Sequence, residues 1–282
     1  MKKALLVGIN AYPSPNELQG CVNDVTNVRD ILIKYFDFKS DEIRVLVDDR
    51  ATYINIVERL GWLTQDAGEY EKLVFHYSGH GSQIVDRDGD ELRDNMDEIL
   101  CPVDFDWDSN FLADDQLARI FKGVPKGKLE VILDSCHSGT ATRNMTSPQM
   151  VRIGDIEISD YRKSRSILPP VDIQCRIDED KEYVKTRILR GVSKEEEALG
   201  HVLYAGCKDY QTCADAYIGG SYNGAFTYYF CKIIRATYDS TGSFLRRSDL
   251  ISKVNRSLRY GKYGQTPQIE GSRSDKNSGI FS

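Results

Sequence analysis

Two short motifs contain residues that together could carry out covalent chemistry. The sequence VILDSCHSGT runs from aliphatic residues into Asp134 and Cys136, and the sequence FHYSGHGSQ places His80 between two glycines. A thiol with its ordinary pKa of about 8.5 is mostly protonated at neutral pH, so a nucleophilic cysteine needs a nearby base. Cys136 and His80 are therefore a candidate nucleophile and a candidate base.

Short apolar segments alternate with amphipathic ones and must position these motifs. The apolar segments are nearly continuous in Val, Leu and Ile, which is typical of strands in a sheet that is covered on both faces. We expect strands at 3–9, 43–48, 72–78, 129–135 and 201–207 and helices over 21–36, 51–67, 224–238 and 246–260. This order predicts an α/β fold with a mostly parallel central sheet and helices on both faces.

Open parallel sheets bind ligands beyond the carboxyl ends of their strands, where three of the expected strands run into polar residues. That edge would bring one set of side chains into a single cleft: Asp24, Ser78, His80, Asp134 and Cys136. The glycines that flank His80 would let a substrate carbonyl approach the backbone. The N–H groups of Gly81 and Cys136 would then form an oxyanion hole.

Composition narrows the class of protein. The chain has 282 residues, of which 40% are hydrophobic, and a formal net charge of −6. No basic face indicates nucleic acid, and no segment is long enough to span a membrane. The acidic charge weakly favours a cationic substrate or a metal. Seven cysteines without paired spacing are typical of reduced thiols, so we expect a cytoplasmic protein.

The two motifs resemble the histidine and cysteine motifs of the caspase-like cysteine peptidases. The segments INAYPSPNELQGCVNDV and CPVDF resemble the metacaspase branch, and similarity resumes at GGSYNGAFTYYF and GQTPQIEG. Animal caspases carry Gln-Ala before their cysteine, where this chain has Asp134 and Ser135. The resemblance implies a caspase-like fold and cysteine peptidase activity. Because the chain begins at the first expected strand, we expect the bacterial type that has no prodomain.

Carboxylates predict the specificity of the cleft. Asp134 lies two residues before Cys136, hence on the same side of an extended strand, and Asp24 is expected at the neighbouring strand edge. Two carboxylates facing one pocket repel each other unless a cation lies between them, so we expect Arg or Lys before the cleaved bond, at P1. The resemblance implies the same preference and matches Cys21, Asp24, Ser78 and Asp134 to the P1 pocket. The alternative is that Asp24 caps a helix and Asp134 orients a turn.

The stretch 86–115 is dense in acidic residues and predicts either a solvated loop or a site for a hard cation. Glu91 occupies the position where an EF-hand loop needs glycine, which excludes an EF-hand. The resemblance implies a different calcium site, in which Asp97, Asp114 and Asp115 match the ligand positions. A further acid that often follows the catalytic cysteine is absent from TATRN. We expect calcium to stimulate the enzyme.

The apolar pattern breaks down between residues 143 and 197. We interpret the chain as one peptidase domain: a block at 1–142 with the Cys/His dyad, a partly mobile linker at 143–197, and a smaller block at 198–282. A protease that selects Arg or Lys is expected to cut its own linker and so to be made as a zymogen. The linker's candidate P1 residues are Arg143, Arg152, Arg162, Lys163, Arg165, Arg176, Lys185, Arg187, Arg190 and Lys194.

Other chemistries fit these residues less well. A cysteine phosphatase needs an arginine after five intervening residues, and Arg143 is one residue too late. His76 and His80 have the spacing of a helical zinc pair, but the Ser-Gly between them favours a strand end. We therefore expect a monomeric cysteine endopeptidase that acts on proteins or peptides. The alternative is a catalytically silent or differently activated caspase-like scaffold that binds partners without cutting them.

Overall fold

The centre of the molecule is a six-stranded sheet with the order β14–β11–β7–β3–β1–β2. The computed structural model describes residues 1–85, 96–136, 149–153, 156–160, 162–188, 200–208 and 210–281. Every neighbouring pair in the sheet is parallel except β11 with β14, which agrees with the mostly parallel sheet that the sequence predicted. The strands are β1 (Lys2–Gly8), β2 (Ile43–Val47), β3 (Lys72–Ser78), β7 (Leu129–Asp134), β11 (Val202–Ala205) and β14 (Gln268–Glu270).

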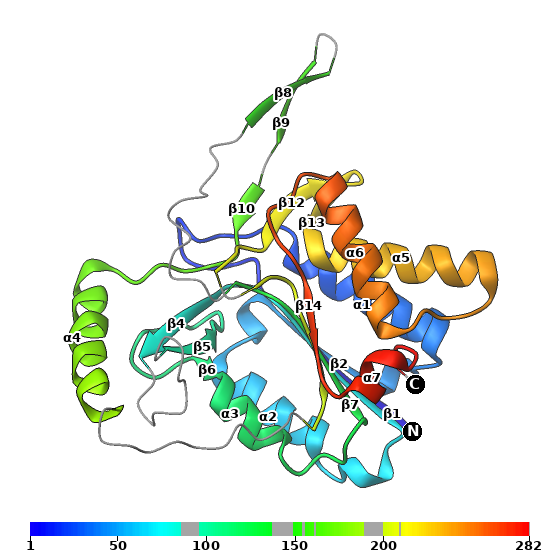
Figure 1. Ribbon diagram of the computed structural model, residues 1–282, viewed down its shortest axis with the longest axis horizontal. Helices are drawn as coiled ribbons and strands as arrows, with labels where there is room; N and C mark the ends of the chain where they lie inside the picture. Colours follow the sequence, from blue (N-terminus) through cyan, green and yellow to red (C-terminus); the bar gives the residue numbers. More distant parts are fainter. Residues whose placement is uncertain are drawn as a thin grey trace.

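Helices cover both faces of this sheet (Figure 1). One face carries α1 (Cys21–Phe36), α5 (Ala225–Thr241) and α6 (Arg247–Tyr260), and the other carries α2 (Tyr53–Thr64) and α3 (Asp114–Phe121). Because side chains alternate along a strand, Leu6 packs into the first core and Leu5 into the second. All the predicted strands and helices are present, whereas α3 and the short C-terminal helix α7 (Arg273–Asn277) were not predicted.

Smaller antiparallel pieces surround the central sheet. They are β4 (Gly81–Val85), β5 (Met96–Leu100) and β6 (Leu112–Ala113); β8 (Gln149–Ile153) with β9 (Ile156–Asp160); β10 (Arg162–Ser164), β12 (Ala214–Ile218) and β13 (Ser221–Gly224). Short 3₁₀ turns occupy Ser40–Glu42, Asp48–Arg50 and Ala67–Glu69. Few of these segments have a continuous apolar run, which is why the sequence pattern does not predict them.

The described part of the linker is more regular than the sequence predicted. It contains helix α4 (Val171–Ile188), whose Ile173 and Ile177 lie one turn apart and pack against Val85 and Met96. The β8–β9 ribbon projects away from the body, and β10 leads back to it (Figure 1). Candidate P1 residues Arg143, Arg190 and Lys194 lie outside the described residues.

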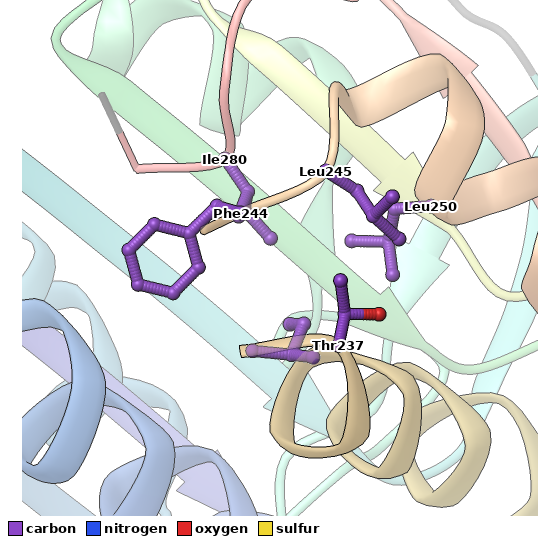
Figure 2. Close-up of a pocket in the computed structure, with 6 residues that line it drawn as sticks. Thr237, Phe244, Leu245, Leu250 and Ile280 are labelled. Atoms are coloured by element: carbon purple, nitrogen blue, oxygen red, sulfur yellow. The ribbon is translucent and has the colours of Figure 1, made fainter. Parts of the chain in front are cut away.

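One small pocket between α5 and α6 is apolar (Figure 2). Thr237 on α5, Leu250 on α6 and Ile280 near the C-terminus line it together with Phe244 and Leu245. None of these side chains is ionisable or a typical catalytic nucleophile, so we interpret the pocket as a gap in core packing. Within the described chain, no helix combines the length and the hydropathy that a membrane crossing requires.

Candidate active site

The candidate nucleophile and base follow adjacent parallel strands. Ser78 at the end of β3 lies opposite Asp134 at the end of β7. His80 and Cys136 each come two residues after this pair, and both are buried. Burial lowers the pKa of His80 to about 4, although the Asn16 hydrogen bond and the Cys136 charge act in the opposite direction. His80 is therefore a neutral imidazole at neutral pH, as a general base must be.

A backbone carbonyl orients the imidazole. His80 Nε2 lies 2.6 Å from the carbonyl oxygen of Asn16, and no hydrogen-bond partner of Nδ1 is found among the described residues. Because a carbonyl can only accept, Nε2 must carry the proton and Nδ1 is left as the basic nitrogen. Tyr12 supports this arrangement, since its ring lies 4.5 Å from the imidazole and its hydroxyl accepts the backbone N–H of His80 at 3.0 Å.

The sulfur of Cys136 has unusual neighbours. Burial by itself would raise the pKa of this thiol, but hydrogen bonds from the thiols of Cys207 and Cys213 and from the Cys213 N–H outweigh it. The pKa of Cys136 consequently lies well below its ordinary value. These hydrogen bonds thus make it easier for His80 to take the thiol proton and produce the thiolate, which is the reactive form of cysteine.

Arg165, from the segment between β10 and α4, fills the predicted P1 pocket and is completely buried. Its Nη2 lies 2.7 Å from Asp24 Oδ2 and 3.0 Å from Asp215 Oδ1. Its Nη1 lies 3.4 Å from Asp134 Oδ1 and donates to Ser78 Oγ at 2.7 Å. Three carboxylates from three different elements therefore surround one guanidinium.

The carbonyl of Arg165 lies in the predicted oxyanion hole. It accepts the N–H of Gly81 at 3.1 Å and the N–H of Cys136 at 3.2 Å. The Arg165 N–H donates to the carbonyl of Cys213 at 3.2 Å. A peptide substrate needs these contacts at P1: the side chain in a pocket and the carbonyl polarised beside the nucleophile.

The residues on both sides of Arg165 are held as an added strand. On one side, β10 pairs with β12 in antiparallel register, with Ser164 opposite Ala214. On the other side, the Ile167 N–H donates to the Gly81 carbonyl at 3.0 Å, and Ser82 Oγ donates to the Ile167 carbonyl at 2.7 Å. Main-chain pairing of this kind binds an extended peptide with little regard to its side chains.

The pocket acids are held by hydrogen bonds from α5 and the residue before it. Asp24 accepts the N–H of Gly224, and Asp134 accepts both the N–H and the hydroxyl of Thr227. A Cβ on Gly224 would overlap the Asp24 and Asp134 carboxylates and the Arg165 guanidinium. Burial raises the pKa of Asp24 to about 7 against the lowering effect of Arg165, and burial also raises the pKa of Asp134.

These contacts show what the side chain of each acid touches. Asp24 does not cap its helix through its side chain, because its carboxylate faces Gly224 and Arg165. Asp134 does both jobs, since it holds the first turn of α5 through Thr227 and also pairs with Arg165. Both acids therefore face the pocket.

Cys21 lies beside the pocket, and none of its described hydrogen bonds is to Arg165. It is fully buried, its thiol hydrogen-bonds with Ser78, and its N–H donates to Asn10 Oδ1 at 2.9 Å. Burial raises the pKa of this thiol far above its ordinary value, so Cys21 contributes packing and stays neutral.

Sequence reasoning missed Asp215, Gly224 and the orienting carbonyl of Asn16. Asp215 also accepts the N–H groups of Gln19 at 2.8 Å and Gly20 at 2.9 Å, so it joins the first loop to β12. The only signal was an acid in the stretch CADAY, which no expected strand contained.

The three acids expected to bind calcium lie around one end of the β4–β5–β6 sheet. Asp97 is on β5, and Asp114 and Asp115 begin α3 directly after β6, which pairs with β5. Asp114 Oδ1 accepts the Asp115 N–H at 2.9 Å, and the Asp115 carboxylate lies 3.7 Å from Arg119. Carboxylate oxygens suit calcium chemically. Among the described residues, however, the only three possible metal ligands whose ligand atoms all lie within 4.8 Å of one another are the sulfurs of Cys136, Cys207 and Cys213. Asp97, Asp114 and Asp115 do not form such a group.

The architecture and the cysteine–histidine site define a caspase-like α/β protein. A Geobacter sulfurreducens protein of known structure superposes with a TM-score of 0.62 at 21% identity, covering 100% of this chain and 98% of its own. Caspase-1 from Spodoptera frugiperda superposes with a TM-score of 0.51 at 13% identity, covering 96% of this chain and 86% of its own.

The sequence comparisons identify the family within this fold. The family model for the metacaspase, peptidase C14 domain matches residues 2–144. Metacaspase-1 of Scheffersomyces stipitis is 33% identical over 95% of this chain and 70% of its own length. Metacaspase-1 of Meyerozyma guilliermondii is 32% identical over 96% and 69%. This chain belongs to the metacaspase peptidase C14 family of cysteine peptidases.

Proposed function

We propose that the protein is a cysteine endopeptidase that cleaves after Arg or Lys and that cuts its own linker after Arg165. The observation that carries this proposal is the position of Arg165, with its guanidinium among three carboxylates and its carbonyl between two N–H donors. An uncharged or acidic P1 side chain would leave the buried carboxylates without a counter-charge, which is costly in a dehydrated pocket.

The geometry supports a definite sequence of steps. Cys136 attacks the carbonyl carbon of Arg165, and the N–H groups of Gly81 and Cys136 stabilise the resulting oxyanion. His80 Nδ1, oriented by Asn16, takes the thiol proton and passes it to the amine of Ser166 as the peptide bond breaks. Water then hydrolyses the thioester. Release of the segment would leave the same pocket open to a P1 residue of another protein.

Calcium stimulation is a separate proposal. Its support is the oxygen chemistry of Asp97, Asp114 and Asp115 and their position around one pair of strands. A bound calcium ion would neutralise their mutual repulsion, and no catalytic step passes through it. We expect calorimetry to show calcium binding that Asp97→Asn weakens and that the exposed control Asp41→Asn leaves unchanged.

Hydrolysis of two fluorogenic peptides tests the peptidase itself. The peptides differ only at P1, Arg against Asp, and each is measured with and without millimolar calcium. We expect wild type to cleave the Arg peptide alone and Cys136→Ala to cleave neither. Cleavage after Asp would contradict the pocket assignment. A wild-type chain that cleaves neither peptide under any of these conditions would favour the scaffold alternative.

A further inference from the structure

Three buried thiols meet at the nucleophile. The sulfurs of Cys136, Cys207 and Cys213 lie within 4.8 Å of one another, and the exposed fractions of the three residues are 0%, 6% and 1%. All three are free thiols. Peptide cleavage as described needs only one sulfur, because His80 supplies the base and backbone N–H groups supply the oxyanion hole. The two extra thiols therefore call for another explanation.

Cys213 is the better placed of the two neighbours. Its backbone brackets the nucleophile, since its N–H donates to Cys136 Sγ and its carbonyl lies 3.4 Å from the same sulfur. Its own thiol lies 3.1 Å from the carbonyl of Ser135, the residue directly before Cys136. The two residues therefore touch through both backbone and side chain, and their sulfurs lie within 4.8 Å of each other.

Cys207 contacts Cys136 through its thiol alone, and that thiol also lies near two backbone carbonyls. Its sulfur lies 3.6 Å from the carbonyl of Ser135 and 3.5 Å from the carbonyl of Gln211. None of these contacts ties its backbone to Cys136. We therefore treat Cys207 as the matched control.

We propose that Cys213 is a resolving cysteine that captures the oxidised nucleophile as a Cys136–Cys213 disulfide and so switches the peptidase off reversibly. The Cys136 thiolate attacks a peroxide, giving a sulfenic acid and releasing hydroxide or an alkoxide. The Cys213 thiol then attacks the Cys136 sulfur, forming the disulfide and releasing water. A dithiol reductant returns both thiols and is itself oxidised to a disulfide. This proposal rests on the proposed function in two respects: Cys136 is the nucleophile, and cleavage after Arg165 uncovers it.

The Arg165 segment determines when peroxide can reach Cys136. Its carbonyl accepts the Cys136 N–H, and the nucleophile beneath it is fully buried. Peroxide would therefore reach Cys136 after the segment leaves, so the exposed, active form is the one that is protected. Without a resolving thiol, a sulfenic acid is oxidised further to a sulfinic acid that thiols do not reduce.

The experiment uses the self-processed chain treated with hydrogen peroxide and then with dithiothreitol. Wild type, Cys213→Ser and the control Cys207→Ser are compared by peptide mapping in a mass spectrometer and by the share of each variant's own starting activity that returns. We expect wild type and Cys207→Ser to form the Cys136–Cys213 disulfide and to recover. We expect Cys213→Ser to gain two oxygen atoms on Cys136 and to recover about tenfold less.

Three results would overturn the proposal. They are the absence of any disulfide at Cys136 in wild type, a Cys136–Cys207 linkage instead, or full recovery of Cys213→Ser. Cys213→Ala serves as a second variant if the serine disturbs folding. Self-processing is scored first, from the size of the chain, and the mapping then detects the disulfide without using activity, so failed self-cleavage is distinguished from a failed thiol switch.

Discussion

Two arginines are buried in the described chain, and the charges around them differ. Arg165 is paired with three carboxylates that belong to α1, β7 and β12. Arg247 on α6 lies 2.6 Å from Glu130, and Lys72 lies 3.5 Å from the same carboxylate. The Arg165 cluster therefore has more acids than bases, and the Arg247 cluster has more bases than acids.

The origin of each cation explains the difference. Glu130, Lys72 and Arg247 all belong to the central sheet and its covering helix, and Glu130 also accepts the hydroxyl of Tyr204 at 3.0 Å. That cluster is complete within the folded body. The acids around Arg165 are equally fixed, but their cation arrives on a segment of the linker. The first cluster thus lies wholly within the folded body, whereas under the proposed function the second receives an exchangeable cation.

The largest effect should appear when the structural cluster is broken. Arg247→Met leaves Glu130 buried with fewer donors, which should lower the free energy of unfolding by about 3–5 kcal/mol. Arg165→Met should cost less than half as much, because its segment can leave and let water hydrate the acids. Urea unfolding in a Cys136→Ala background, which prevents self-cleavage, measures both. Equal losses would contradict the distinction between the two clusters.

Removing one pocket acid should affect catalysis more than stability. Asp215→Asn removes one of the carboxylates that pair with the P1 guanidinium. The value of kcat/KM for an Arg peptide should therefore fall roughly a hundredfold, which corresponds to a loss of about 3 kcal/mol of transition-state stabilisation. Asp239→Asn, an exposed acid on α5, is the control and should change little. A similar loss in both variants would mean that net charge, and not the pocket, attracts the substrate.

A smaller effect is expected from filling the pocket. Gly224→Ala introduces a Cβ that overlaps the Asp24 and Asp134 carboxylates and the P1 guanidinium. The KM for an Arg peptide should rise roughly tenfold, as expected for crowding a packed site. Gly264→Ala, at a position with open space around it, is the matched control. If the two variants bind the Arg peptide equally well, the P1 side chain does not pass Gly224.

The smallest predicted effect is a dependence on pH. With the pKa of Asp24 at about 7, this carboxyl gains a proton as the pH falls through 7, and KM for an Arg peptide should then rise by a few-fold. His80, with a pKa of about 4, stays neutral in the same window, so kcat should hold. Kinetics at pH 5.5–8 separate the two. A fall in kcat with constant KM would assign the change to His80 instead.

The raised pKa of Asp24 also makes the stability of the folded chain depend on pH. The pKa of Asp24 is raised in the folded chain from an ordinary 3.8. The Asp24 carboxyl therefore makes its full contribution to the free energy of unfolding below about pH 4, and this contribution is lost as the pH rises through about 7.

The sequence predicted the part of the site that stands at strand ends. Cys136, His80, Asp24 and Asp134 follow buried apolar strands or open an amphipathic helix, so periodicity together with the sequence motifs and the family resemblance predicts where they lie. Asp215 could not be located in this way, because β12 belongs to a short hairpin without an apolar run. The carbonyl of Asn16 has no side-chain signature at all.

The linker shows a second limit of sequence reasoning. Arg165 was one of many basic residues in a segment of irregular pattern, and nothing local distinguishes it from Arg162 or Lys163. Its selection is a tertiary effect, since β10 pairs with β12 in a single register that delivers residue 165 to the pocket. Helix α4, of which Ile173 and Ile177 pack into one small cluster, was likewise too weakly patterned to predict.

Sequencing the N-terminus of the smaller self-cleavage fragment tests the central claim most directly. Wild type should yield a fragment that begins at Ser166, and Cys136→Ala should stay intact. Arg165→Gln should lose this cut while the other linker arginines remain in place. A wild-type chain that is cut elsewhere in the linker while the Arg165–Ser166 bond stays intact would contradict the account.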